Sequence, residues 1–437
     1  MKLNSTTRKY EDPSVEDVAS FRARATEWLA ATRPRKSSTS ATSRSWGEGK
    51  FDVTVFHDRT IAEELRYLTN YVEWIEQRYA AGFWGITWPV EWGGAALTKA
   101  HERAYMDAEA SFVVPNDHEL ISVTTKLVAP ALLAYGSDAQ KQRFLADFLT
   151  AKQYCCQLFS EPGAGSDLAG LACKAARDGD EWVLDGQKVW TSNAHITPWG
   201  FAICRTDPNV PKHAGLTAFL VPFATDGVEI RAIKQMNGGA SFNEVFFTGA
   251  RIPDELRIGH VGDGWKIALA ILGFERESSG GSGRRGGDFE DLLLLARHMD
   301  RADDPLIRQA LARVYSVQKA RGWARDHAAA VKQKSGSSGP GGSIGKLLWT
   351  QAMQQMSTVV GDLLGPALTA DTGEWGTFDW NQHVLGAPGY RIAGGSDEIQ
   401  RNIIGERVLG LPGEPRVDRD ISFSDLQQLQ RQNGAGR

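Results

Sequence analysis

The densest group of residues that could bind a ligand is the segment QLFSEPGAGSD at 157–167. Its small residues and single proline force a tight backbone path directly after an apolar run. Such a path exposes amide N–H groups, which bind phosphate and other oxygen-rich groups. The segment fits neither GxGxxG nor GxxxxGK(S/T), so it predicts neither a dinucleotide fingerprint nor a P-loop. By composition alone, an ordinary glycine-rich surface loop is the simpler interpretation.

Two other groups of residues carry weaker signals. Glu275 and Arg276 follow an apolar helical run. A carboxyl group in an apolar pocket has a raised pKa, which suits a base that removes a carbon-bound proton near neutral pH. An exposed ion pair is the alternative, and it is the simpler interpretation of an isolated Glu-Arg doublet. The glycine-rich run GGSGRRGG at 280–287 is interpreted as a solvated linker.

The composition is that of a packed globular chain. Of the 437 residues, 42% are apolar and 23% are charged, and this length suggests roughly two to four domains. Lysine plus arginine number 49 and aspartate plus glutamate 53, so the net charge of -4 offers no positive field for non-specific nucleic-acid binding. The longest apolar stretches, such as 267–272, are too short to cross a bilayer. We therefore expect neither a nucleic-acid partner nor a membrane span.

The cysteines give no sign of a metal site. None of the four forms a CxxC pair or has a histidine at zinc-ligand spacing, so we expect no metal. Cys155 and Cys156 lie in an apolar run and are expected to be buried thiols, as in a reducing compartment. Residues 1–11 contain no apolar segment of the kind that a secretory signal needs. We expect a cytoplasmic protein.

Hydrophobic periodicity divides the chain into three domains followed by a tail. The first domain has helical steps, most clearly at 61–79, where we expect one buried apolar stripe. The second contains short β-prone runs separated by turn residues, which predict a compact β barrel or sandwich. Helices return in the third domain, and the tail has little to bury. The expected boundaries are 1–152 for the N-terminal helical domain, 153–256 for the central β-barrel domain, 257–415 for the C-terminal helical bundle and 416–437 for the tail.

Three short segments add local predictions. Asp185-Gly186 stands between two β-prone runs and predicts a tight hairpin turn. The segment 33–50 is rich in Ser, Thr and basic residues, and 335–342 is rich in Ser and Gly. Neither has hydrophobic periodicity, so both are expected to be flexible.

Six segments match one family in the same order along nearly the whole chain. They are WPVEWGG (88–94), QLFSEPGAGSD (157–167), KVWTSNA (188–194), SFNEVFFTGARIP (241–253), GWKIALAILGFER (264–276) and GGSDEIQRNIIGERVLGLP (394–412). Taken together, they resemble the acyl-CoA dehydrogenase family. The resemblance implies an α+β multidomain fold with an N-terminal helical domain, a central β barrel and a C-terminal four-helix bundle. This agrees with the domains that the periodicity predicts.

The resemblance also implies FAD, bound in an extended conformation between the β barrel and the C-terminal bundle, usually in a homotetramer. Backbone donors and a hydroxyl group suit the polar edge of a flavin ring. An indole packed on that ring shields one face from water and oxygen, although Trp190 could instead be a tryptophan of the barrel core. By resemblance, cofactor contacts are expected from Gln157, Phe159, Ser160, Gly165, Ser166, Trp190, Ser192, Ser396 and Glu398, and substrate contacts from Ser166, Arg276 and Gly394.

The reaction that the resemblance implies is the α,β-dehydrogenation of an acyl-CoA thioester to a trans-2-enoyl-CoA, as in fatty acid β-oxidation. A carboxylate removes the pro-R α-proton while the β-hydrogen leaves as hydride to flavin N5, and the electrons pass to an electron-transferring flavoprotein. Because the α-proton is weakly acidic, donors must polarise the thioester carbonyl where enolate charge develops. In the family these donors are a flavin ribityl hydroxyl and one backbone N–H, which aligns with Gly394.

The catalytic base is where this chain departs from many relatives. They carry it in a Tyr-Glu-Gly-Thr/Ser pattern, and here the corresponding residues, 393–396, are Ala-Gly-Gly-Ser. A second branch, which resembles isovaleryl- and long-chain acyl-CoA dehydrogenases, has the base on a C-terminal-domain helix just before an arginine. Glu275 matches that place. Glu277 is two residues further along, which turns a side chain by about 200° on a helix, so both cannot face one pocket. Glu275 is the predicted base.

Two further departures concern the cofactor site. The segment DLLGP at 362–366 replaces an ILGG turn that contacts FAD from the neighbouring subunit in many relatives, and Pro366 has no N–H. An Arg-x-x-Phe-Gly segment of the family is missing between 297 and 309. A non-catalytic structural subunit of a hetero-oligomer and an acyl-CoA oxidase are therefore alternative interpretations. The presence of Trp190 and Glu275 favours the dehydrogenase.

Overall fold

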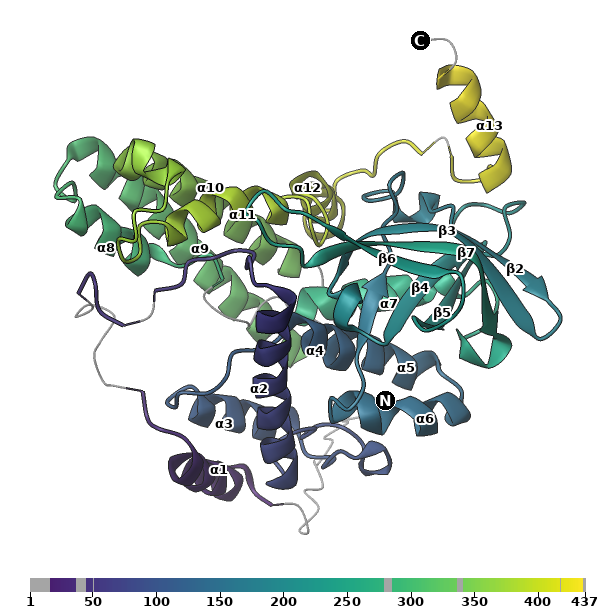
Figure 1. Cartoon of the computed structure of the whole chain (residues 1–437), viewed down its shortest axis with the longest axis horizontal. Helices are drawn as coiled ribbons and strands as arrows, with labels where there is room; N and C mark the ends of the chain where they lie inside the picture. Colours follow the sequence, from purple (N-terminus) through teal and green to yellow (C-terminus); the bar gives the residue numbers. More distant parts are fainter. Residues whose placement is uncertain are drawn as a thin grey trace, which may run out of the picture.

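The computed structural model describes most of the chain in three successive groups of elements (Figure 1). The segments expected to be flexible, 33–50 and 335–342, lie partly outside the described residues. The described residues are 16–36, 45–49, 51–278, 285–335, 341–416 and 418–434, and of 276–278, 332–335 and 433–434 only the backbone is described. Helices, then a sheet, then helices follow one another, which confirms the expected α+β multidomain fold.

The N-terminal domain is helical. Thr60 and Glu63 form a capping box at the start of its longest helix, α2. The face of α2 that packs inward contains Leu68, Trp74 and Ile75. The predicted buried stripe is wrong at both ends of the helix, because Ile61, Leu65 and Tyr79 are 56%, 43% and 38% exposed. The helices are α1 (Val18–Thr32), α2 (Ile61–Ala80), α3 (Lys99–Glu109), α4 (Glu119–Val123), α5 (Ala129–Tyr135) and α6 (Asp138–Leu149).

The central domain contains an eight-stranded mixed sheet with the strand order β6-β7-β3-β2-β4-β5-β8, and β1 pairs with β4 in parallel. Most other neighbours are antiparallel, including the long pair of β3 with β7. Successive residues of β7 largely alternate between the buried and the outer face, whereas β4 and β5 are buried along almost their whole length. The strands are β1 (Cys155–Leu158), β2 (Lys174–Asp178), β3 (Glu181–Ser192), β4 (Trp199–Arg205), β5 (Leu216–Pro222), β6 (Val228–Ile233), β7 (Phe242–Pro253) and β8 (Arg257–Ile258).

The predicted hairpin turn at Asp185-Gly186 is wrong. Strand β3 runs through both residues, and its register against β7 shifts between Leu184 and Asp185. The shift is a bulge whose extra residue, Gly249, lies on β7, and Gly186 itself pairs with Phe247 in the ladder. Gly186 has a φ of 144°, and a Cβ there would lie only 2.8 Å from the Cα of Cys173. The close approach of a neighbouring segment explains the glycine, and two adjacent residues cannot reveal that neighbour.

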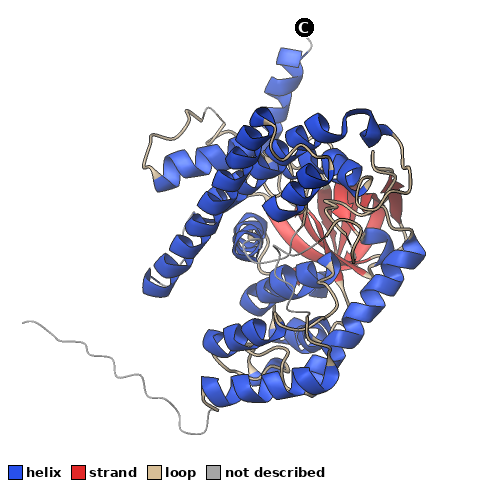
Figure 2. Ribbon diagram, turned by 90° about the vertical axis from the view of Figure 1, so that its left-hand side faces the viewer, coloured by secondary structure: helices blue, strands red, loops and turns tan. Residues whose placement is uncertain are grey.

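The helices of the C-terminal domain contribute to two separate hydrophobic cores. Ile267, Ala268 and Ile271 of α7 belong to the core that the N-terminal helices share with the sheet. The other long helices enclose a second core around Trp380, which also includes Phe51 from the N-terminal part of the chain. Figure 2 shows this bundle beside the sheet. The helices are α7 (Gly264–Ser278), α8 (Phe289–His298), α9 (Pro305–Ser335), α10 (Gly341–Leu364), α11 (Asp379–Tyr390) and α12 (Asp397–Ile403).

The tail contains a helix, and Phe423 is the one buried residue among the described residues of the tail, which agrees with the expectation that it has little to bury. Helix α13 (Phe423–Gly434) stands beside the sheet in Figure 1. Phe423 is buried, and the guanidinium carbon of Arg205 lies 3.8 Å from its ring centroid. The ammonium of Lys212 lies 2.5 Å from Asp418 of the tail and 2.9 Å from Asp167. The tail is thereby anchored to the end of the segment predicted to bind a ligand.

Candidate active site

The predicted base and the predicted oxyanion donor lie together. Helix α7 buries Ile267 and Ile271, and Glu275 follows at the next step of four residues on the same face. Glu275 is half-buried. A Cβ on Gly394 would lie 3.2 Å from Glu275 Oε1. The carboxylate of α7 therefore reaches the backbone position where the loop pattern of other relatives places its own glutamate.

The loop that contains Gly394 is closed by side-chain hydrogen bonds. Gly394 and Gly395 have φ values of 63° and 82°, a left-handed conformation that glycine adopts without strain. Gln400 Nε2 donates to the carbonyl oxygens of both glycines, at 3.0 and 3.2 Å. The buried carboxylate of Asp397 accepts from Arg391 Nε at 2.9 Å. The two ends of the loop are thus tied, and its backbone is held in place.

On the cofactor side, a buried ion pair holds the predicted ligand segment against the sheet. Glu161 accepts hydrogen bonds from Lys188 Nζ at 2.7 Å and from the backbone N–H of Cys173 at 3.0 Å. Lys188 is fully buried and also donates to the carbonyl oxygens of Phe159 and Ile203. Burial opposes its charge, but the neighbouring Cys173 thiol and the Glu161 carboxylate outweigh burial and raise the pKa of Lys188. Neither Glu161 nor Lys188 was a predicted site residue, and a charged pair inside β-prone runs is the signal that could have revealed them.

Trp190 lies beside this segment. The backbone N–H of Val189 donates to the Ser160 carbonyl at 2.9 Å, which ties β3 to the ligand segment. Trp190 has a φ of 61° at a shift in the register of β3, an unusual conformation for a bulky residue. Its side chain is 60% exposed, so the alternative of a barrel-core tryptophan is wrong. A large exposed indole held in a strained conformation fits the cofactor contact that the resemblance implies.

The remaining predicted site residues differ in their contacts and in their burial. Ser396 is the N-cap of α12, and its hydroxyl accepts from the Ile399 N–H at 3.3 Å. Glu398 points toward Arg401, and both side chains are largely exposed. The side chain of Arg276 lies outside the described residues. Of the other predicted cofactor contacts, Phe159 is buried, Gln157, Ser160 and Ser192 are half-buried, and Gly165 and Ser166 are exposed.

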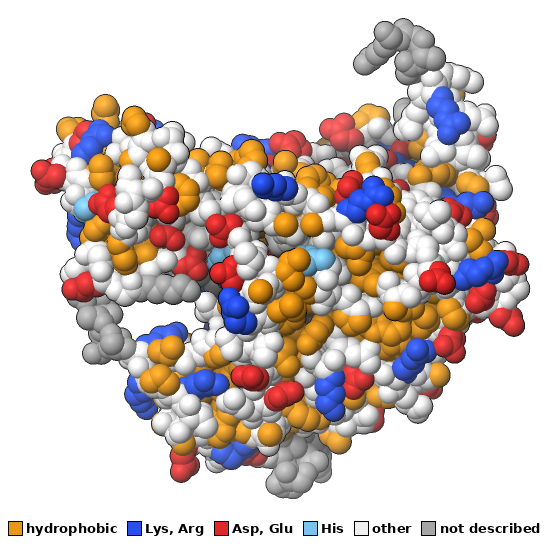
Figure 3. Space-filling view, viewed as in Figure 1, with side chains coloured by type: hydrophobic (Ala, Val, Ile, Leu, Met, Phe, Trp, Pro, Cys, Tyr) orange, Lys and Arg blue, Asp and Glu red, His pale blue; other side chains and the backbone are white. Residues whose placement is uncertain are grey.

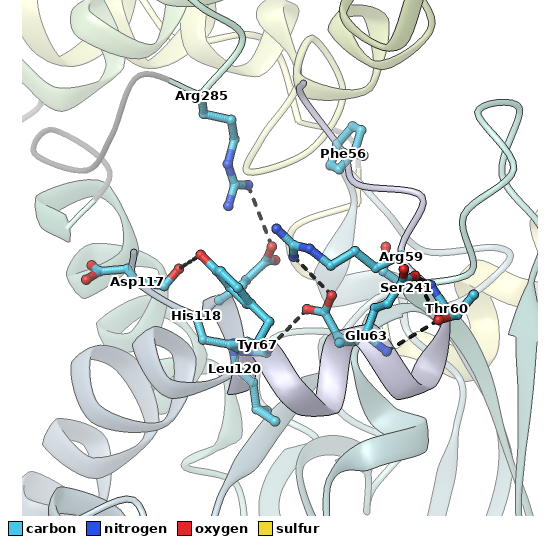
Figure 4. A network of polar contacts seen from close by, with 12 residues as sticks. Phe56, Arg59, Thr60, Glu63, Tyr67, Asp117, His118, Leu120, Ser241 and Arg285 are labelled. Carbon is cyan, nitrogen blue, oxygen red and sulfur yellow. Dashed lines mark hydrogen bonds and ion pairs between the residues drawn. The ribbon is translucent and has the colours of Figure 1, made fainter. Parts of the chain in front are cut away.

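A polar network that was not predicted joins the N-terminal and C-terminal domains (Figure 4). His118 Nε2 lies 2.9 Å from Glu64, and Arg59 lies 3.0 Å from the same carboxylate. The His118 Nδ1 accepts from the backbone N–H of Leu120, so Nε2 bears the proton that faces Glu64. Burial alone would raise the pKa of Glu64, but the hydrogen bonds from His118 and Arg59 lower it to about 2. The carboxylate of Glu64 is therefore an ionised centre of this network.

Arg285 extends the network to the C-terminal domain. Its guanidinium lies 3.6 Å from Glu119 and contacts the hydroxyl of Tyr390. Figure 4 shows Arg285 reaching from above toward the N-terminal helices. The interpretation of 280–287 as a solvated linker is therefore wrong for Arg285, whose partners lie far away in the sequence. Residues 280–284 lie outside the described residues.

Comparison with known proteins finds the same family that the sequence resembles. Residues 54–152, 156–250 and 262–409 match the N-terminal, middle and C-terminal domains of acyl-CoA dehydrogenases. The acyl-CoA dehydrogenase IpdE1 of Mycobacterium tuberculosis is 39% identical over 92% of this chain and all of its own length. A steroid acyl-CoA dehydrogenase structure, Tcur3481-Tcur3483, covers 92% of this chain and 99% of its own at a TM-score of 0.69 and 25% identity. The ChsE4-ChsE5 complex from M. tuberculosis covers 93% of this chain and 100% of the matched chain, with a TM-score of 0.65 and 24% identity.

This chain belongs to the acyl-CoA dehydrogenase family. It is an oxidoreductase, and its family indicates FAD as the cofactor. The exposed Trp190 beside the segment 157–166 fits such a group. Within the described residues, no helix has the length and apolar character that crossing a membrane requires.

Proposed function

We propose that this chain dehydrogenates an acyl-CoA thioester at its α and β carbons, with Glu275 as the base. The observation that carries the proposal is the 3.2 Å between Glu275 Oε1 and the position of a Cβ on Gly394. Other members have a glutamate in the loop. In this chain Gly394, which has no side chain, occupies that position, and the carboxylate comes from α7. Removal of the α-proton requires an ionised, positioned carboxylate, and this arrangement supports that role.

The backbone around Gly394 supplies the second part of the chemistry. Its N–H would donate to the thioester carbonyl oxygen, where negative charge develops as the α-proton leaves. The loop's hydrogen bonds from Gln400 support this role, because a fixed donor needs no reorganisation during the reaction. Ser166 and Arg276 would bind the acyl-CoA.

The cofactor would lie against the sheet. FAD supplies, when bound, the acceptor for the β-hydrogen and passes the electrons to an electron-transferring flavoprotein. Trp190 would exclude water from one face of its ring. The residues that would hold it are Gln157, Phe159, Ser160, Gly165, Ser166, Trp190, Ser192, Ser396 and Glu398.

The assembly would be a homotetramer or a dimer of dimers. Large hydrophobic side chains are exposed, among them Met236, Trp323 and Ile392, and hydrophobic side chains gather over the sheet near the centre of the face in Figure 3. Such surfaces mark contacts with a partner chain. Because one structural relative is a complex of two different chains, a structural subunit of a hetero-oligomer is the second candidate function. The buried thiols suit a cytoplasmic location.

The decisive experiment follows the visible spectrum of the purified chain. Acyl-CoA thioesters with a short, a branched, a long and a steroid-derived acyl group are added in turn, and bleaching of the flavin band identifies the substrate class. Glu275→Gln should keep the flavin colour and lose the bleaching, whereas Glu277→Gln, two residues along α7, should still bleach. Unchanged bleaching in Glu275→Gln would remove this residue from the mechanism. A colourless chain that gains flavin only with a partner would favour the structural subunit.

A further inference from the structure

The loop at 391–397 receives support from α10, which contributed no residue to the predicted site. Lys346, in the second turn of α10, donates from its ammonium group to the Gly395 carbonyl oxygen. Thr350, four residues further along α10, donates to Asp397 Oδ1 at 2.8 Å. Residues four apart share one helical face, so α10 contacts the loop at two adjacent points.

The same lysine places a positive charge within electrostatic reach of the predicted base. Lys346 is half-buried, and its ammonium interacts electrostatically with Asp397, Glu275 and Glu398. Burial lowers the pKa of Lys346, and these three carboxylates oppose that effect. Among the residues whose side chains are described, the charged or titratable groups around this site include Lys346 on α10, Tyr390 on α11 with its neighbours Arg285 and Glu119, Arg391 in the loop, and Asp397 and Glu398 on α12.

Resting on the function proposed above, we propose that Lys346 is a positioning residue for removal of the α-proton. Through the Gly395 carbonyl it fixes the turn that presents the Gly394 N–H, and its positive charge attracts the Glu275 carboxylate. A neighbouring cation favours the ionised form of a carboxyl, which is the form that accepts a proton. Gly394 and Gly395 have no side chains with which to hold this turn, and Lys346 adds a third hydrogen bond to the two that Gln400 donates to their carbonyl oxygens.

The test replaces Lys346 by Met in the holoenzyme. The substrate is the acyl-CoA that bleaches the wild-type flavin fastest, and a misplaced donor should lower kcat by roughly 10- to 100-fold with a smaller change in KM. The acid limb of the kcat/KM profile should move to higher pH, because Glu275 then ionises without the nearby cation. Exchange of the α-hydrogen in D2O, followed by mass spectrometry, should slow to a similar degree. Lys346→Arg keeps a cation and should restore the position of the acid limb.

Two other variants separate charge from shape. Gln400→Leu removes the other side chain that donates to the Gly395 carbonyl, and it removes no charge. The kcat should therefore fall while the acid limb stays in place. Lys319→Met on α9 removes an exposed lysine that packs on Tyr315 and should behave as the wild type.

The inference is overturned if Lys346→Met keeps the wild-type kcat and acid limb. It is also overturned if the variant loses flavin or melts earlier while its acid limb stays in place, since that outcome describes a structural residue. An inactive wild type would overturn the proposed function and this inference with it. An active wild type with an unaffected Lys346→Met variant would overturn this inference alone.

Discussion

The two sides of the candidate active site are held in different ways. On the cofactor side, the ligand segment is fixed within one domain by the strand ladder and by the buried pair of Glu161 and Lys188. On the base side, Glu275 comes from α7 and Gly394 from the loop between α11 and α12, and hydrogen bonds from side chains to carbonyl groups hold that loop in place. The first side depends on one charge pair that water does not reach, and the second on many weaker contacts. Single substitutions should therefore affect folding on the first side and catalysis on the second.

The largest expected effect is on the cofactor side. Lys188→Met removes the cation and leaves the buried Glu161 carboxylate without it, so the free energy of unfolding should fall by about 3–5 kcal/mol. Urea denaturation followed by circular dichroism measures this change. Lys174→Met, at an exposed position of β2, is the matched control and should change stability by less than about 0.5 kcal/mol.

A double variant tests whether the unpaired buried charge causes the loss of stability. Lys188→Met with Glu161→Gln removes both charges, so much of the lost stability should return, because no unpaired charge remains buried. If Lys188→Met alone were no less stable than Lys174→Met, the buried pair would not hold the ligand segment, and the comparison between the two sides would fail.

The sequence predicted the parts of this architecture that local patterns encode. The order of helical, β and helical domains follows from periodicity, and the strands lie in the central region where the β-prone runs predict them. The segments matching the family led to Glu275 and to Gly394, and their proximity agrees with those assignments. The role of each as base or donor stays a prediction until the variants are measured.

The sequence could not predict contacts that depend on distant partners. In the sequence, Lys188 is an ordinary charged residue. Only the fold brings Glu161 and the carbonyl oxygen of Ile203 into contact with it. Arg285 lies in a glycine-rich run that is typical of linkers, and its partner Tyr390 is 105 residues away. Glycines likewise mark either a turn or a close approach, and only the fold distinguishes the two at Gly186. These errors share one physical cause, which is long-range packing.

The next effect concerns the junction network of Figure 4, which lies outside both sides and, like the cofactor side, contains a partly buried ion pair. Glu64 has a pKa of about 2 in the folded chain and an ordinary value of 4.5. A lowered pKa stabilises the fold above pH 4.5, and this contribution is lost as pH falls from about 4.5 to about 2. For this partly buried group, its size is about 2 kcal/mol. The measurement is the free energy of unfolding as a function of pH.

Glu64→Gln isolates that contribution. The variant should be less stable than the wild type at pH 6 by about 2 kcal/mol, and the two curves should converge near pH 2. Glu63→Gln alters the neighbouring, exposed carboxylate of the capping box and is the control, with a much smaller difference. Parallel curves for the wild type and Glu64→Gln would show that Glu64 is not the titrating group.

The smallest effect on stability, and the sharpest test of the base side, is expected from Gly394→Ala. A Cβ at a φ of 63° costs about 1 kcal/mol, and this one would lie 3.2 Å from Glu275 Oε1. The carboxylate must then shift by a few tenths of an ångström, so kcat should fall by roughly tenfold or more while the flavin stays bound. Gly373→Ala is the matched control, because Gly373 has a φ of 74° and a Cβ there would meet nothing within 4 Å. Both variants should lose similar stability, and only Gly394→Ala should lose activity. Equal activities would mean that the approach of Glu275 to the loop has no part in catalysis. The catalytic base would then have to be another carboxylate.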